Sequence, residues 1–136
     1  MKIISMLPFL DEESKDELVE SILNNELKEG SHVIPAILPF LSNKQIHKLY
    51  IAALEKKIDA SPYEMLPFVS QEAINEAIDR IESGDLDGVK LERMLPFLST
   101  DNVRKIFKQA FKHYKKSDSD TKEEPPKPTE DKEENE

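Results

Sequence analysis

The tripeptide Leu-Pro-Phe occurs four times in this chain, and its recurrence restricts the fold more than any other feature of the sequence. It stands at 7–9, 38–40, 66–68 and 95–97, so successive copies are 31, 28 and 29 residues apart. A self-similar unit of this length is typical of helical repeat proteins, in which each repeat completes its core only by stacking on its neighbours.

The residues that follow each tripeptide have the period of a helix. When the leucine of the tripeptide is position 0, positions +8, +11, +12 and +15 are mostly apolar and lie on one helix face, with Lys15 as the exception in the first copy. The residue at position +4 is of a type that favours a helix N-cap in every copy. In the second copy, Gln45 completes a capping box with Ser42. The predicted N-caps are Asp11, Ser42, Ser70 and Ser99.

The tripeptide itself is predicted to form a structural corner. Proline costs a helix a hydrogen bond and clashes with the preceding turn, so Leu-Pro-Phe should end a short helix just before the next N-cap. The flanking leucine and phenylalanine are expected to fill the corner as part of the core, and a ligand-binding role for the tripeptide is the alternative. The corner residues are Leu7, Pro8, Phe9, Leu38, Pro39, Phe40, Leu66, Pro67, Phe68, Leu95, Pro96 and Phe97.

These patterns predict an all-α fold with a disordered tail. Repeats of about 28–31 residues, starting near residues 7, 38, 66 and 95, should stack within a domain spanning 1–116. Periodicity does not distinguish a small solenoid from a compact bundle. Residues 117–136 contain nine acids, three lysines, three prolines and no large apolar residue, and they carry −6 of the net charge of −9. Such a segment cannot offset the entropy of ordering itself.

The residue types present argue against catalysis and metal binding. The chain has no cysteine, which excludes disulfides, thiolate metal sites and a cysteine nucleophile. His32, His47 and His113 lack the spacing of a metal site, and the segment 83–92 would place Met94 where a calcium loop needs glutamate. Because no catalytic or phosphate-binding motif occurs either, the sequence predicts a protein that is not an enzyme and has no cofactor.

The segment 101–116 combines a basic face with an apolar one. The basic residues are Arg104, Lys105, Lys108, Lys112, Lys115 and Lys116, and the apolar residues are Val103, Ile106, Phe107, Ala110, Phe111 and Tyr114. One interpretation is an amphipathic helix that contacts membrane headgroups or nucleic acid. The other is a capping helix with a solvated polar face. The acidic tail would compete with an anionic partner, which makes nucleic acid an unlikely one.

The repeats resemble the helical N-terminal region of LiaX-type, daptomycin-sensing surface proteins of Gram-positive bacteria. The resemblance covers about residues 5–116 and is carried by the four copies of Leu-Pro-Phe with the two residues after each, and by the turn at 84–88. It implies a role in the cell-envelope stress response and recognition of membrane-active cationic peptides. Members of that family usually continue into a β-rich region, whereas this sequence continues into the acidic tail.

The preferred functional hypothesis is a non-enzymatic binding module that presents acidic helix faces to a cationic peptide or a protein partner. The alternative is a membrane-surface or structural protein that uses the basic helix 101–116. The N-terminus lacks the features of a signal peptide, and the longest apolar run, at 33–41, is nine residues, against about 20 for a spanning helix. The expected location is therefore the cytoplasm, or the cell surface without a conventional signal peptide. The oligomeric state stays open.

Overall fold

The structure is a computed structural model that describes residues 1–28 and 30–115. Within these residues every regular element is a helix, so the all-α prediction is confirmed. Residues 1–99 form one compact unit, and a second unit begins at Thr100. This boundary divides the range 1–116 that the sequence predicted as one domain. Lys116 and the tail 117–136, predicted to be disordered, lie outside the described residues.

The first unit alternates long and short helices. The three long helices have 12 residues each: α2 (Glu12–Leu23), α4 (Asn43–Leu54) and α6 (Gln71–Glu82). The short helices have four residues each: α1 (Ile3–Met6), α3 (Ile34–Ile37), α5 (Pro62–Met65) and α7 (Leu91–Met94). Each short helix continues into a 3₁₀ turn formed by Leu-Pro-Phe: η1 (Leu7–Phe9), η3 (Leu38–Phe40), η4 (Leu66–Phe68) and η5 (Leu95–Phe97). A further 3₁₀ turn, η2 (Gly30–Val33), precedes α3.

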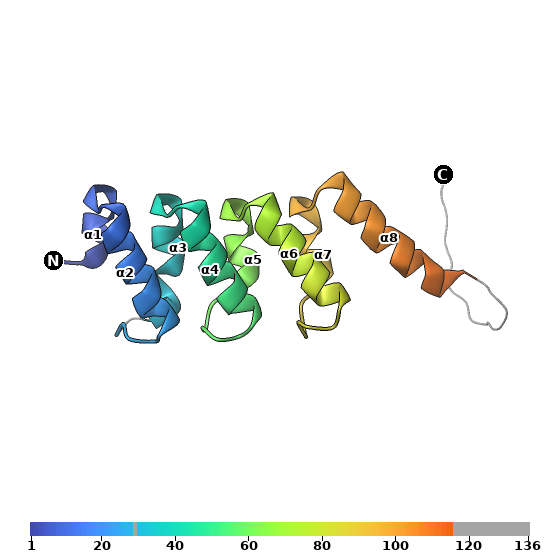
Figure 1. The fold of residues 1–136 in the computed structure, drawn as a ribbon, viewed down its shortest axis with the longest axis horizontal. Helices are drawn as coiled ribbons and strands as arrows, with labels where there is room; N and C mark the ends of the chain where they lie inside the picture. The colour runs from blue at the N-terminus through green and yellow to red at the C-terminus, as the bar shows by residue number, and fades with distance from the viewer. Residues whose placement is uncertain (29, 116–136) are drawn as a thin grey trace. The chain divides into compact units, whose positions relative to one another are not determined.

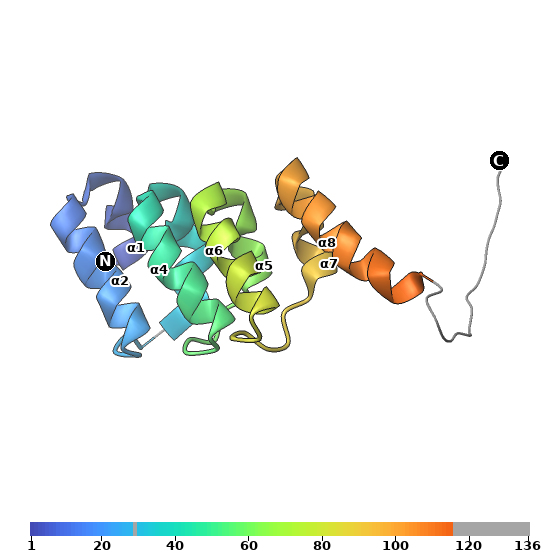
Figure 2. The ribbon, with the colours of Figure 1, turned by 45° about the vertical axis from the view of Figure 1, so that its right-hand side comes forward.

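The repeats of the first unit stack in a row. Helix α2 packs on α4, and α4 packs on both α5 and α6. Figures 1 and 2 show the three long helices side by side in one layer, with the short helices in a second layer behind them. Of the two predicted arrangements, residues 1–99 therefore adopt the solenoid. The second unit contains α8 (Thr100–Tyr114), the longest helix described.

Each Leu-Pro-Phe corner has the same geometry. The chain stays helical through the proline. The first residues of a helical turn have no carbonyl acceptor for their N–H groups, so proline, which has no N–H, loses no hydrogen bond there. The leucine carbonyl then accepts a hydrogen bond from the N–H three residues later, at 3.2–3.3 Å in all four corners. The backbone becomes extended at this third residue and at the following N-cap, which reverses the chain into the long helix.

The long helices begin and end as the repeat requires. Asp11, Ser42 and Ser70 each accept a hydrogen bond from the backbone N–H three residues on, and Gln45 completes the capping box, as predicted. At the other end, position +18 adopts the left-handed conformation in all three repeats, with φ of 58°, 64° and 84° at Asn25, Lys56 and Gly84. Hydrogen bonds back to the last turn complete a Schellman motif there.

The structure corrects the expectation that the tripeptide phenylalanines belong to the core. Leu7, Leu38 and Leu66 are buried, but Phe9, Phe40 and Phe68 are exposed, and Phe97 is half-buried. A 3₁₀ turn advances about 120° per residue. The phenylalanine, two residues after the leucine, therefore points away from the core. The third residue after the leucine returns to the side of the turn that faces the core. Leu95 also differs from its equivalents, with 40 % of its surface exposed.

Candidate functional site

The polar side chains of the long helices connect neighbouring repeats. Glu20 on α2 pairs with Lys48 on α4 at 3.0 Å, and His47 on α4 contacts Glu76 on α6 at 2.9 Å. The amide of Gln45, which is buried, donates to Asp16 at 2.7 Å. These contacts fix the register in which one long helix lies against the next. In each pair of neighbouring long helices, the residue at position +10 of the later helix (Lys48 or Glu76) contacts the residue at +13 (Glu20) or +9 (His47) of the earlier helix.

A second group of charges joins the turn after α4 to α6. The guanidinium of Arg80 lies 2.8 Å from Glu55 and 2.6 Å from Asp85, which raises the pKa of Arg80 chiefly through the hydrogen bond to Asp85. The pKa of Glu55 is lowered by its hydrogen bonds, first from Lys57 and then from Arg80. These groups are all paired within the stack, so we assign them to packing between repeats.

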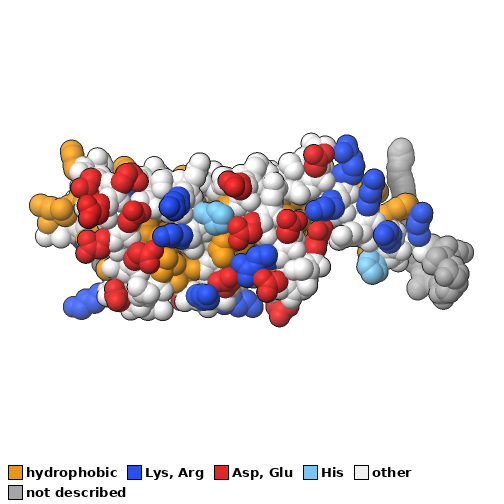
Figure 3. Space-filling view, in the orientation of Figure 1, with side chains coloured by type: hydrophobic (Ala, Val, Ile, Leu, Met, Phe, Trp, Pro, Cys, Tyr) orange, Lys and Arg blue, Asp and Glu red, His pale blue; other side chains and the backbone are white. Residues whose placement is uncertain are grey.

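Charge alternates along the layer of long helices. Helix α2 carries five acids and one lysine, α4 carries two lysines and no acid, and α6 carries four acids and one arginine. Lys48 of α4 pairs with Glu20 on α2, and His47 of α4 contacts Glu76 on α6, so α4 contacts an acid on each neighbouring long helix. Glu13 and Glu17 on α2 are exposed and form no ion pair within the described residues. Figure 3 shows acidic side chains gathered over α2, at the end of the stack.

The first repeat also leaves apolar side chains uncovered. Ile3, Ile4, Met6 and Phe9 are 47, 42, 43 and 86 % exposed. Figure 3 shows hydrophobic side chains at this end of the stack, beside the acids of α2. We call this surface the leading face, and define it as Ile3, Ile4, Met6, Phe9, Glu13 and Glu17.

The repeat symmetry explains why the leading face is apolar. Met6 occupies position −1, and its equivalents Ile37, Met65 and Met94 are 0, 1 and 0 % exposed. Each of those three follows a long helix of the preceding repeat, and α4 indeed packs on α5. Among the described residues no long helix precedes α1, and Met6 is 43 % exposed.

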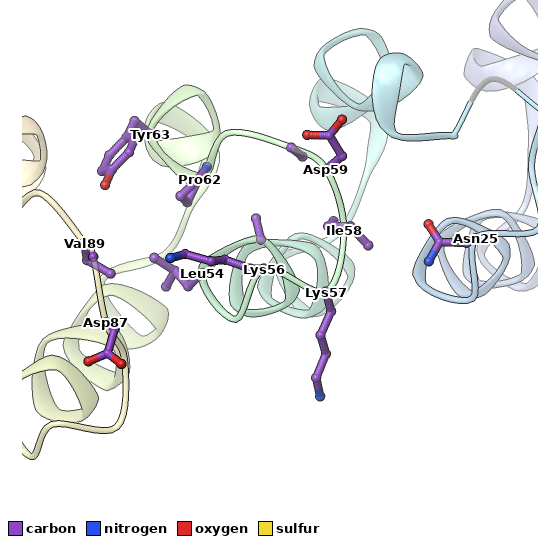
Figure 4. A pocket seen from close by; sticks show the side chains of 13 residues that line it. Asn25, Leu54, Lys56, Lys57, Ile58, Asp59, Pro62, Tyr63, Asp87 and Val89 are labelled. Atoms are coloured by element: carbon purple, nitrogen blue, oxygen red, sulfur yellow. The ribbon is translucent and has the colours of Figure 1, made fainter.

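A hollow in the first unit lies at the turns that follow the long helices. It encloses about 570 Å³ and is lined by side chains from three successive repeats, including Asn25, Lys56, Asp59 and Asp87. In Figure 4 the side chain of Lys57 points away from the other lining residues, and Asp87 and Val89 come from the turn after α6.

Tyr63 lines the same hollow and is occupied in holding two repeats together. Its hydroxyl accepts a hydrogen bond from the N–H of Lys90 at 2.8 Å. Its ring lies 4.3 Å from the guanidinium carbon of Arg93, a cation–π contact between α5 and α7. The Tyr63 side chain therefore contributes to packing between repeats, and we interpret the hollow as part of the contact between successive repeats.

Tyr50 is a core residue with a polar group that the sequence did not single out. Its side chain is completely buried at position +12, where the other stacked repeats have Val19 and Ile78. The hydroxyl has no hydrogen-bond partner among the described residues. Burial raises the pKa of the Tyr50 phenol well above its usual range.

Helix α8 is amphipathic, as the sequence predicts. Phe107 and Phe111 are 59 and 47 % exposed, and their rings stack with centroids 5.4 Å apart. The ammonium of Lys115 lies 5.6 Å from the centre of the Phe111 ring. Five of the six predicted cations, Arg104, Lys105, Lys108, Lys112 and Lys115, lie on or directly after this helix and are exposed. The structure therefore brings these cations together on one helix.

The described residues hold no group of three or more histidine, aspartate or glutamate side chains that could bind a metal ion. Among the same residues, no helix is both long enough and apolar enough to span a bilayer. Comparison with protein-family models, with curated proteins and with solved structures found no match to this chain.

Proposed function

We propose that this protein is a non-enzymatic binding module whose leading face binds a cationic amphipathic helix, supplied by a peptide or a protein partner. The observation that carries the proposal is the exposure of Met6, 43 %, at a repeat position where the other three residues are buried and follow a long helix in the chain. A surface that repeats the helix-binding side of an internal repeat is complementary to a helix in shape and in apolar character.

Charge supports a cationic ligand. Glu13 and Glu17 lie on α2 beside the apolar part of the leading face, and neither forms an ion pair within the described residues. Within the stack, position +10 pairs with the preceding helix through Lys48 and Glu76, and Glu17 is the residue at +10 of the first repeat. A helix on the leading face would therefore present a cation to Glu17. The resemblance to LiaX-type proteins makes membrane-active cationic peptides the first ligands to test.

The experiment is a calorimetric titration of the full chain with a cationic amphipathic helical peptide. Glu17→Lys should weaken binding roughly fivefold or more, because it replaces an attraction by a repulsion. Glu72→Lys makes the same change in net charge at an exposed position of an interior repeat and should have a smaller effect. Binding should also weaken as salt is raised, since exposed charges are screened.

A second variant separates shape from charge. Met6→Glu adds a negative charge and removes an apolar contact, so it should weaken binding if the peptide helix lies on the leading face. If attraction were only electrostatic, the added charge would strengthen binding. Phe68→Glu, at an exposed apolar position of the third repeat, is the matched control. Equal affinities for Met6→Glu, Phe68→Glu and the unaltered chain would refute the proposal.

A peripheral membrane contact through α8 is the second candidate. The observation that favours it is the stacked, exposed pair Phe107 and Phe111 beside the cations of the same helix, an arrangement suited to the headgroup region of an anionic bilayer. Co-sedimentation with phosphatidylserine vesicles that is lost when Lys105, Lys108 and Lys112 become glutamate would support this candidate. Unchanged co-sedimentation of that variant, or none with the unaltered chain, would refute it.

A further inference from the structure

Two of the exposed apolar surfaces among the described residues correspond to the two sides of a single repeat contact. Met6 stands at position −1, where the equivalents in later repeats are buried and each follows a long helix in the chain. Phe107 stands at position +12 of the fourth repeat, where Val19, Tyr50 and Ile78 are at most 1 % exposed, and Phe107 is 59 % exposed. Among the described residues no long helix precedes the first surface, and the second belongs to a long helix whose apolar face is exposed.

We propose that helix α8 of one copy binds the leading face of a second copy, so that the solenoid continues from molecule to molecule. The inference rests on the proposed function of the leading face and names one occupant for it, a second copy of this chain. Helix α8 has the ligand chemistry already required, because it is amphipathic and cationic. It has, in addition, the repeat register of α2, α4 and α6.

Charge complementarity in that register supports a second copy as the occupant. Inside the stack, position +13 of one long helix pairs with +10 of the next through Glu20 and Lys48, at 3.0 Å. Position +9 contacts +10 through His47 and Glu76, at 2.9 Å.

Between copies, the same positions are held by cations on α8 and by an acid on α2. Lys108 is at +13 and Arg104 is at +9 of the fourth repeat, and Glu17 is at +10 of the first. A contact that repeats the internal geometry therefore places both cations opposite Glu17. The remaining acid of the leading face, Glu13, lies one helical turn from Glu17 and adds to the attraction.

This contact is heterologous, because the two copies use different surfaces. After pairing, one copy still has a free leading face and the other still has a free α8, so association does not stop at two unless a ring closes. The expected behaviour is a mass that rises steadily with protein concentration and falls as salt is added. An isologous dimer would instead reach a plateau at twice the monomer mass.

The test is sedimentation velocity of the full chain and of two single variants, Met6→Glu and Phe107→Glu. Each variant alone should be monomeric, because one removes the leading face and the other removes the apolar face of α8. An equimolar mixture of the two should form a 1:1 dimer and nothing larger, since only one intact junction is available. The recovery of association in the mixture also demonstrates that both variants are folded.

A charge exchange tests the register independently and uses only exposed side chains. Glu17→Lys and Lys108→Glu should each weaken association roughly fivefold, and the double variant, whose net charge is that of the unaltered chain, should recover most of it. Glu72→Lys and the pair Glu72→Lys with Lys108→Glu are the matched controls, and the control pair should show no recovery.

The outcomes separate this inference from the function on which it rests. An unaltered chain that stays monomeric at every concentration, a plateau at two copies, or a mixture of the two variants that stays monomeric would overturn the inference. Peptide binding that persists in the same sample would leave the proposed function standing. Loss of peptide binding as well would remove both.

Discussion

The buried hydroxyl of Tyr50 permits a stability prediction whose sign is opposite to that of most core substitutions. Tyr50→Phe removes one oxygen atom that has no hydrogen-bond partner among the described residues. A buried polar group without a partner costs roughly 1–3 kcal/mol. The oxygen also makes packing contacts worth about 0.1–0.2 kcal/mol each, and the loss of several of them offsets part of the gain. The expected result is a stabilisation of about 1 kcal/mol.

The matched control is Tyr63→Phe, which removes the same atom from a tyrosine whose hydroxyl is satisfied. That hydroxyl accepts a hydrogen bond from the N–H of Lys90 at 2.8 Å, so its loss should destabilise the protein by about 1 kcal/mol. Urea denaturation followed by circular dichroism measures both changes. Because 1 kcal/mol shifts the melting temperature of a domain of this size by about 4–8 °C, thermal unfolding gives a second readout.

Alkaline pH provides an independent check on the same side chain. Burial raises the pKa of the Tyr50 phenol in the folded protein above its value in the unfolded chain, about 10. Above that pH the unfolded chain loses the proton while the folded protein keeps it, so folding becomes less favourable as pH rises. Tyr50→Phe should therefore lessen the alkaline loss of stability. A neutral or destabilising effect at pH 7, together with an unchanged alkaline profile, would refute the reasoning.

Four further substitutions test the ends of the long helices by urea denaturation. Ser70→Ala removes the cap of α6 and should cost about 1 kcal/mol, and a neutral result would contradict the cap assignment. Lys56→Gly should stabilise by about 0.5 kcal/mol, because Lys56 has a φ of 64° that glycine adopts more readily, and Gly84→Ala should destabilise by about 1 kcal/mol at the equivalent position. If Lys56→Gly and Gly84→Ala changed the free energy of unfolding in the same direction, the result would contradict a left-handed conformation shared by the two positions. Hydrogen bonds from Ser14 hold the pKa of Asp11 in the folded protein below its usual range. The Asp11 carboxylate therefore stabilises the fold at pH values above its pKa in the unfolded chain, and this stabilisation is lost as pH falls through its pKa in the folded protein. Asp11→Asn should therefore reduce the acid dependence of unfolding, and an unchanged acid profile would argue against this linkage.

The repeat, the long helices and their caps could be predicted because each depends on residues close together in sequence. The spacing of the tripeptides indicates the length of the repeat, and the N-cap residue at position +4 indicates where each long helix begins. The left-handed residue at +18 was not predictable in the same way. Asn25, Lys56 and Gly84 have little in common as residue types, and the conformation became evident only when their backbone angles coincided.

Features that depend on stacking were less accessible. The contacts of Glu20 with Lys48 and of His47 with Glu76 join residues 28 and 29 apart, and they require the packing register of the long helices. The phenylalanines were placed in the core because the direction of a side chain in a 3₁₀ turn is not visible in an apolar pattern. For the same reason the leading face was not predicted, since Met6 resembles its buried equivalents in sequence and differs only in what covers it.

The leading face is the central claim, and amide chemical-shift mapping of the full chain with a cationic amphipathic peptide tests it most directly. The account predicts that the largest shifts occur in α1, in η1 and along α2 near Glu13 and Glu17, and that Met6→Glu reduces them. Shifts concentrated on the exposed Phe40 and Phe68, on the hollow lined by Lys56, or nowhere in residues 1–28 would contradict it.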